Sequence, residues 1–220
     1  MKIPLKYTLR NFRTRRLTTA ITVMGIALVV FVFTAVLMLA AGVRKTLVAT
    51  GSTENIIVAR KAAQGEISSI ILNDTYNIIL SLPQVAKGSD QRPLASGDVV
   101  VIINLPKIGT GGGISNVTVR GVPDFVMQLR PSVKIVEGRA AKPGAMEAIL
   151  GTRMRGRFKG LELGQSFELR KNNEVAIVGI FEDAGSSFES EVWSDIEVVK
   201  QGFRREGMVS SVRVRLDLPS

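Results

Sequence analysis

The chain has 220 residues, with 29 Lys and Arg against 19 Asp and Glu, a formal net charge of +10, and neither His nor Cys. The absence of His and Cys excludes His-based catalytic triads, thiol nucleophiles, disulfides and the commonest metal ligands. The length allows one domain or two small ones, and the scattered aromatic residues do not favour a nucleic-acid-binding surface.

The N-terminal part reads as a basic segment followed by a membrane span. Residues 1–16 carry six basic side chains and no acid, and the 27 residues from Leu17 to Val43 carry no charge. A helix of that length reaches about 40 Å, more than the ~30 Å hydrocarbon layer requires. The sequence therefore predicts a transmembrane helix over residues 17–43, which we expect to continue as helix through Ala49. The basic excess before the span predicts a cytoplasmic N-terminus and an extracytoplasmic location for the rest.

Two features of this region have competing interpretations. A cleaved signal peptide also begins with a basic stretch and an apolar run, and residues 40–42 have the small side chains of a cleavage site. The apolar run of a signal peptide is about 7 to 15 residues, so the length here favours a retained anchor. Residues 2–14 fit an interfacial helix that begins after Pro4, or a flexible basic tail on anionic lipid.

Short alternating elements replace the continuous apolarity after residue 50. Strands are predicted over residues 55–59, 98–104, 116–121, 145–150, 165–170, 174–181 and 210–216, and helices over residues 66–82, 124–129, 152–158 and 195–203. Asn172 and Asn173 predict a two-residue hairpin turn, because Asn tolerates a positive φ. The run 174–181 is too apolar for an exposed edge and predicts an inner strand. The predicted fold class is α+β: one N-terminal transmembrane helix followed by a mixed α/β extracytoplasmic domain.

Three stretches have the composition of functional sites, and each has a simpler explanation. Residues 109–115 are rich in Gly but lack the Lys and Ser or Thr of a phosphate-binding loop, so they predict a flexible connector between two strands. An acidic group lacks the spacing of a calcium loop or of a converging acid/base pair and predicts a solvated loop; it comprises Glu182, Asp183, Glu189 and Glu191. A basic group predicts a solvated helix surface; it comprises Arg153, Arg155, Arg157 and Lys159. No catalytic, cofactor-binding or metal-ligating residue is assigned, and no enzyme is predicted.

Several local sequences, taken in order, resemble the permease subunits of the MacB-like (FtsX/LolC-type) ABC transporter superfamily, in particular its periplasmic core region. Residues 10–27 resemble the entry of these permeases into their first membrane helix. The other matching stretches are residues 81–85 (SLPQV), 119–122 (VRGV), 135–139 (IVEGR), 148–151 (AILG), 163–164 (LG) and 175–180 (VAIVGI). Together they cover nearly the whole chain, and their order behind one membrane helix makes the resemblance fairly specific.

The resemblance implies four regions. These are a cytoplasmic basic segment (1–16), a transmembrane helix (17–43), a stalk with the first strand (44–64) and an extracytoplasmic MacB-like periplasmic core domain (65–220). It further implies a non-catalytic permease in the inner (plasma) membrane that relays ATPase-driven motion for export or extraction of a lipoprotein, peptide or amphiphilic drug. The implied partners are a cytoplasmic ABC ATPase that holds the ATP, a second permease copy in a homo- or heterodimer, membrane lipid and a periplasmic adaptor, with no nucleic acid.

One departure from the family pattern leaves a second function open. Permeases of this family continue into three further membrane helices, whereas this sequence predicts a single span. We therefore expect an N-terminal portion, a truncated product or one part of a split permease. The alternative function is a single-span, membrane-anchored binding or adaptor module in the periplasm that works without nucleotide-driven motion.

Overall fold

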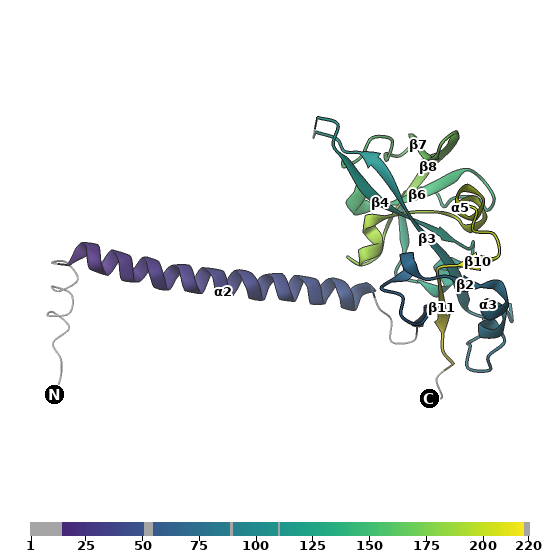
Figure 1. The fold of residues 1–220 in the computed structure, drawn as a ribbon, viewed down its shortest axis with the longest axis horizontal. Helices are drawn as coiled ribbons and strands as arrows, with labels where there is room; N and C mark the ends of the chain where they lie inside the picture. The colour runs from purple at the N-terminus through teal and green to yellow at the C-terminus, as the bar shows by residue number, and fades with distance from the viewer. Residues whose placement is uncertain (1–14, 51–54, 89, 110, 218–220) are drawn as a thin grey trace. The chain divides into compact units, whose positions relative to one another are not determined.

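The computed structural model describes residues 15–50, 55–88, 90–109 and 111–217. The chain divides into two compact units, Met1–Lys45 and Thr46–Ser220. A single uninterrupted helix, α2 (Arg16–Thr50), is the main element of the first unit and extends into the second (Figure 1). The predicted helix over residues 17–43 and its continuation through Ala49 are therefore confirmed. The two interpretations of residues 2–14 lie outside the described residues.

Helix α2 has the chemistry of a membrane span. Within the described residues it is the one helix that is long and apolar enough to cross a membrane. Its hydroxyl groups bond within the helix: Thr22 Oγ1 donates to the Thr18 carbonyl at 3.0 Å, and Thr34 Oγ1 donates to the Val30 carbonyl at 2.7 Å. Polar groups that are satisfied inside the helix can enter hydrocarbon at little cost.

The second unit is built on a nine-stranded mixed sheet in the order β1-β11-β3-β4-β9-β6-β8-β5, with β7 also paired to β8. The strands are β1 (Asn55–Val58), β3 (Ala95–Pro106), β4 (Ile114–Val122), β5 (Lys134–Gly138), β6 (Glu147–Gly151), β7 (Ser166–Arg170), β8 (Asn173–Glu182), β9 (Glu191–Asp195) and β11 (Ser211–Arg215). The β4–β9 and β6–β8 pairs are parallel and the other pairs are antiparallel. Strands β2 (Ile71–Leu72) and β10 (Met208–Val209) form a separate antiparallel pair.

Short helices complete the domain. They are η1 (Glu66–Ser68), α3 (Asn73–Leu80), α4 (Val126–Leu129), η2 (Thr152–Met154), η3 (Ser187–Ser190) and α5 (Ile196–Phe203). The carboxylate of Asp195 caps the N-terminus of α5 by accepting hydrogen bonds from the backbone N–H groups of Glu197 and Val198. Helix α5 lies close against β4 at Gly121, where an added Cβ would come 3.0 Å from Val199 Cβ. The α+β fold class is therefore confirmed.

The first predicted helix that the structure corrects is 66–82. Only its second half is α-helical, as α3, while residues 66–68 form η1. The carboxylate of Glu66 binds Arg120 inside the domain, and Ile71 pairs with Val209 on β10. These partners keep residues 66–72 out of the predicted α-helix, which local helical periodicity does not reveal.

The second correction is the predicted helix over residues 152–158, of which only η2 forms. Gly156 has a φ of +66°, which ends a right-handed helix. Backbone bonds from Ile108 to Arg157 and from Lys159 to Pro106 tie the segment to the β3–β4 hairpin instead. The basic side chains of this stretch are therefore solvated, as predicted, but they do not surround a helix.

The two predicted strand connections are present. A connector between the paired strands β3 and β4 is present, but the predicted range 109–115 runs too far, because Ile114 and Ser115 already belong to β4 and pair with Pro106 and Leu105. The β7–β8 hairpin turns at Lys171 and Asn172, one residue earlier than predicted, and Asn172 supplies the positive φ of 66°. Strand β8 lies between β6 and β5, so the inner position predicted from its apolarity is confirmed. Strands β5 and β9 and helix η3 were not predicted.

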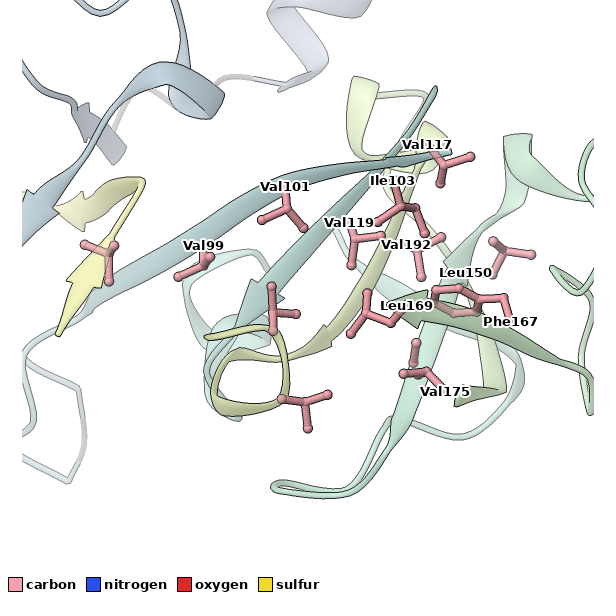
Figure 2. Close-up of a cluster of buried hydrophobic side chains, with 14 of the residues drawn as sticks. Val99, Val101, Ile103, Val117, Val119, Leu150, Phe167, Leu169, Val175 and Val192 are labelled. Carbon is pink, nitrogen blue, oxygen red and sulfur yellow. The ribbon is translucent and has the colours of Figure 1, made fainter. Parts of the chain in front are cut away.

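The main core lies on one face of the sheet. Figure 2 shows its apolar side chains pointing toward one another from β3, β4, β6, β7, β8 and β9. The labelled members are Val99, Val101, Ile103, Val117, Val119, Leu150, Phe167, Leu169, Val175 and Val192. Because neighbouring residues of a strand point to opposite faces, the residues between these core positions face the other side of the sheet.

Candidate functional site

The opposite face of the central strands carries buried charges. Asp98 on β3, Arg120 on β4, Glu191 on β9 and Arg213 on β11 each adjoin a core valine along their strand, and all four are buried. Two further residues join them from outside the sheet: Glu66 from η1, and Arg130 directly after α4. We call these six residues the arginine cluster: Arg120, Arg130, Arg213, Glu66, Asp98 and Glu191.

Arg120 is the centre of the arginine cluster. Its Nε and Nη2 donate to the two carboxylate oxygens of Glu191 at 2.7 and 2.9 Å. Its Nη1 and Nη2 donate to Glu66 at 3.1 and 2.9 Å, and Nη1 also donates to Asp98 at 3.1 Å. These bonds use the full hydrogen-bonding capacity of a guanidinium group, in a side chain that is only 2% exposed. Arg120 therefore joins β4 to β3, β9 and η1.

Each carboxylate of the cluster also has other donors. Asp98 accepts from Arg130 Nη2 at 2.7 Å and from Ser96 Oγ at 2.5 Å. Trp193 Nε1 donates to Glu191 at 2.9 Å, and Ser211 Oγ donates to Glu66 at 2.5 Å. Buried charge is tolerated only when it is paired and hydrogen-bonded in this way.

The pKa values of the cluster residues differ because the three carboxylates are not shared equally among the three arginines. Burial alone would raise the pKa of Glu66, but Arg120 and Ser211 outweigh it and lower the pKa from 4.5 to about 2. Burial opposes the charge of Arg120, yet Glu191, Asp98 and Glu66 raise its pKa well above the ordinary value. Burial lowers the pKa of Arg130 to about 10, because Asp98 offsets only part of the desolvation. Burial likewise lowers the pKa of Arg213.

Aromatic rings supply the remaining stabilisation. The guanidinium carbons of Arg130, Arg120 and Arg213 lie 4.1, 5.1 and 5.2 Å from the centre of the Phe188 ring. Arg130 also lies 4.9 Å from the Trp193 ring centre. In the described residues, Nε and Nη1 of Arg130 and Nε of Arg213 have no hydrogen-bond partner, and the attraction between each cation and the nearby aromatic rings offsets part of that loss.

A small cleft borders the cluster at Trp193, and we call it the Trp193 cleft. Its volume is about 80 Å³, and it lies between the end of β4 with α4, the loop before β6, and the end of β9. The apolar lining residues include Val122, Val126, Met127, Ala141, Ile149 and Trp193, and Asp124, Lys142 and Asp195 are among the polar ones. A cavity of ~150 Å³ holds a benzene molecule, so this cleft has room for about one small apolar side chain.

A third feature, which we call the entry clamp, holds the end of α4. Asn55 Nδ2 and Arg215 Nη2 both donate to the Leu129 carbonyl, at 2.9 and 3.1 Å. Arg215 Nε also donates to Asn55 Oδ1 at 3.3 Å. Asn55 and Arg215 face each other in the β1–β11 register. The clamp therefore connects the first described residue after residues 51–54 to α4.

The structure overturns the solvated loop predicted for the acidic group. Glu182 is exposed, but Asp183, Glu189 and Glu191 are buried. Glu189 accepts from the backbone N–H groups of Asp183 and Gly185 and pairs with Arg153 at 3.0 Å. Local backbone donors and the more distant Arg153 thus compensate for the burial of Glu189, and Arg120 does so for Glu191, whereas Asp183 accepts from Ser186 and keeps its buried Oδ1 without a hydrogen-bond partner in the described part of the chain. Among the residues that the structure describes, no group of His, Cys, Asp or Glu could hold a metal ion.

Sequence reasoning missed the arginine cluster. A signal was present, since Arg120 and Arg213 interrupt strands that are otherwise rich in valine. When the residues on one face of a strand are apolar and those on the other face are charged, the charged face is usually exposed to solvent. The alternating pattern alone therefore does not show that the charged face of these strands is buried. The residues that bury these charges are distant in sequence. Glu66 is 54 residues from Arg120, and Asp98 is 32 residues from Arg130.

Comparison with known proteins supports the same fold. The family model described as the MacB-like periplasmic core domain matches residues 19–218. The structure is similar to the periplasmic region of MacB from Actinobacillus actinomycetemcomitans, at 13% identity and a TM-score of 0.50, over 80% of this chain and 81% of that chain. It is also similar to the extracellular domain of the noncanonic ABC-type transporter YknZ from Gram-positive bacteria, at 13% identity and a TM-score of 0.51, over 74% of this chain and 84% of that chain. A search of curated proteins gave no match. The resemblance indicated by the ordered motifs is confirmed.

Proposed function

This chain belongs to the family of the MacB-like periplasmic core domain, and we propose that it is the permease subunit, or the N-terminal portion of one, of a MacB-like ABC transporter. The observation that carries the proposal is the extent of the family match, which begins inside α2 and runs through the whole sheet domain. In this proposal the chain relays motion from a cytoplasmic ATPase to the periplasm. The motion serves export or extraction of a lipoprotein, peptide or amphiphilic drug.

The length and continuity of α2 support a relay. Its 35 residues correspond to about 52 Å of helix, against a hydrocarbon layer of ~30 Å. The helix continues past the uncharged run that ends at Val43, through Arg44 and Lys45, to Thr50. A continuous helix transmits displacement better than a flexible tether, because its backbone hydrogen bonds resist bending.

The distribution of charge supports the orientation and the partners. The six basic residues before the span favour a cytoplasmic N-terminus, which would place the sheet domain outside. The sequence has no phosphate-binding loop, so we assign ATP to a separate ABC ATPase. A second permease copy, membrane lipid of the inner membrane and a periplasmic adaptor complete the proposed assembly.

Affinity purification tests this function. The full chain, tagged at its C-terminus, is purified from gently solubilised membranes of its own host, with an unrelated single-span protein as control. We expect a co-purifying protein whose peptides contain the Gly-x-x-x-x-Gly-Lys-Ser/Thr motif of an ATPase. Recovery of a periplasmic protein with no ATPase would instead support the anchored adaptor module and contradict the transporter assignment.

A further inference from the structure

We propose that Asn55 is a positioning residue that links the entry point of the sheet domain to the Trp193 cleft, by holding the Leu129 carbonyl at the end of α4. The proposal deepens the relay function and rests on it for its biological role. It identifies α4 and the Trp193 cleft as the part of the domain that responds when the chain is displaced at β1.

The first step is the position of Asn55 in the chain. Only residues 51–54 separate it from the last residue of α2, so along the chain β1 is the first described strand of the domain after the helix. Asn55 does not act alone, because its register partner Arg215 bonds both to its side chain and to the Leu129 carbonyl. The first and last described strands of the sheet domain along the chain, β1 and β11, therefore both donate a hydrogen bond to one carbonyl group, that of Leu129.

The second step is the dependence of α4 on that carbonyl. Helix α4 has four residues, and a single turn is unstable without outside contacts. The last carbonyl groups of a helix have no partner within the helix, so Leu129 O needs external donors. Asn55 and Arg215 provide them, and the Leu129 side chain itself is fully buried.

The third step leads from α4 to the cleft. Val126 and Met127 of α4 form part of the wall of the Trp193 cleft. Arg130, the residue after α4, lies against the Trp193 ring and pairs with Asp98. The entry clamp and the arginine cluster thus hold two adjacent residues at the C-terminal end of α4, the clamp through the Leu129 carbonyl and the cluster through the Arg130 side chain. A shift of Asn55 changes the first restraint and leaves the second, which moves the wall of the cleft relative to Trp193.

The test uses the fact that Trp193 is the sole tryptophan of the chain and is buried. Full-length chain in detergent micelles is titrated with acrylamide, and the quenching constant of Trp193 is measured at a temperature well below unfolding. The variant is Asn55→Asp, which keeps an acceptor for Arg215 but removes the N–H donor to Leu129. Losing one of two donors increases local opening of α4, so we expect the quenching constant to rise about twofold.

The matched control is Ile56→Ala on the same strand, whose side chain is 42% exposed and makes none of the clamp's hydrogen bonds. We expect its quenching constant to equal that of the unmodified chain. Arg215→Met removes the second donor to the same carbonyl and should also raise quenching, so the test does not depend on the folding of one variant.

A purely structural role for Asn55 predicts a different result. In that case Asn55→Asp lowers the melting temperature but leaves the quenching constant of the folded chain unchanged, and the proposal is wrong. An equal rise in Ile56→Ala would also overturn it. The assay needs neither ATPase nor transport, so its failure leaves the permease assignment standing, whereas a failed co-purification leaves the link between Asn55 and the cleft standing.

Discussion

Replacing Arg120 with Met is the most informative perturbation of the sheet domain. The change removes the cation at the centre of the arginine cluster and keeps an unbranched apolar side chain in place of the arginine's aliphatic part. Three carboxylates lose hydrogen bonds at once, and they belong to Glu66, Asp98 and Glu191. The two that lie on the sheet are buried and cannot turn to solvent.

The magnitude follows from what each carboxylate retains. Asp98 keeps Arg130 and Ser96, and Glu191 keeps the Trp193 indole N–H. Glu66 keeps Ser211 and is 24% exposed, so water can solvate it in part. Removing one partner of a buried ion pair costs about 3 to 5 kcal/mol, and the retained donors keep the expected loss in that range. This is a large part of the ~5 to 15 kcal/mol that stabilises a typical domain.

Urea unfolding of the full chain in micelles, followed by Trp193 fluorescence, measures the loss. The matched control is Arg155→Met, which removes an ion pair with Glu137 in which the side chains are 45% and 44% exposed. Pairs of this kind contribute less than about 1 kcal/mol. If Arg120→Met lowers the free energy of unfolding by no more than the control does, the arginine cluster does not stabilise the fold.

Three further predictions concern acid, coupling and orientation. The pKa of Glu66 is lowered to about 2, so the stability that its carboxylate contributes is complete above pH 4.5 and is lost as pH falls through about 2. Glu66→Gln should therefore lower the free energy of unfolding by about 3 kcal/mol at pH 7 and make the melting temperature less dependent on pH below pH 5. Parallel curves of melting temperature against pH for the variant and the unmodified chain would contradict this. Leu47→Pro should kink α2 at a local cost of about 3 kcal/mol. In the complete transporter it should reduce transport while ATP hydrolysis persists, whereas Leu47→Ala should leave both unchanged. Unchanged transport in the Pro variant would refute the relay. A periplasmic phosphatase fused after Ser220 should be active and a cytoplasmic fluorophore silent, and the reverse pattern would show the opposite orientation.

The features that could be read from the sequence are those set by neighbours along the chain. Helix α2 follows from an uninterrupted uncharged run, because a helix satisfies its backbone hydrogen bonds within itself. The inner position of β8 follows from its continuous apolarity, and the hairpin before it from the tolerance of Asn172 for a positive φ. The family could be recognised for a related reason, since its short motifs keep their order along the chain.

The candidate site depends on neighbours that are distant in sequence. The same periodicity that favours helix from residue 66 is overridden where Glu66 meets Arg120, and Glu191 is buried only because that arginine reaches it across 71 residues. The Leu129 carbonyl is held by donors 74 and 86 residues away. Whether a charged side chain faces water or a partner is an energetic balance between desolvation and pairing, and the pairing term exists only once the strands have been brought together.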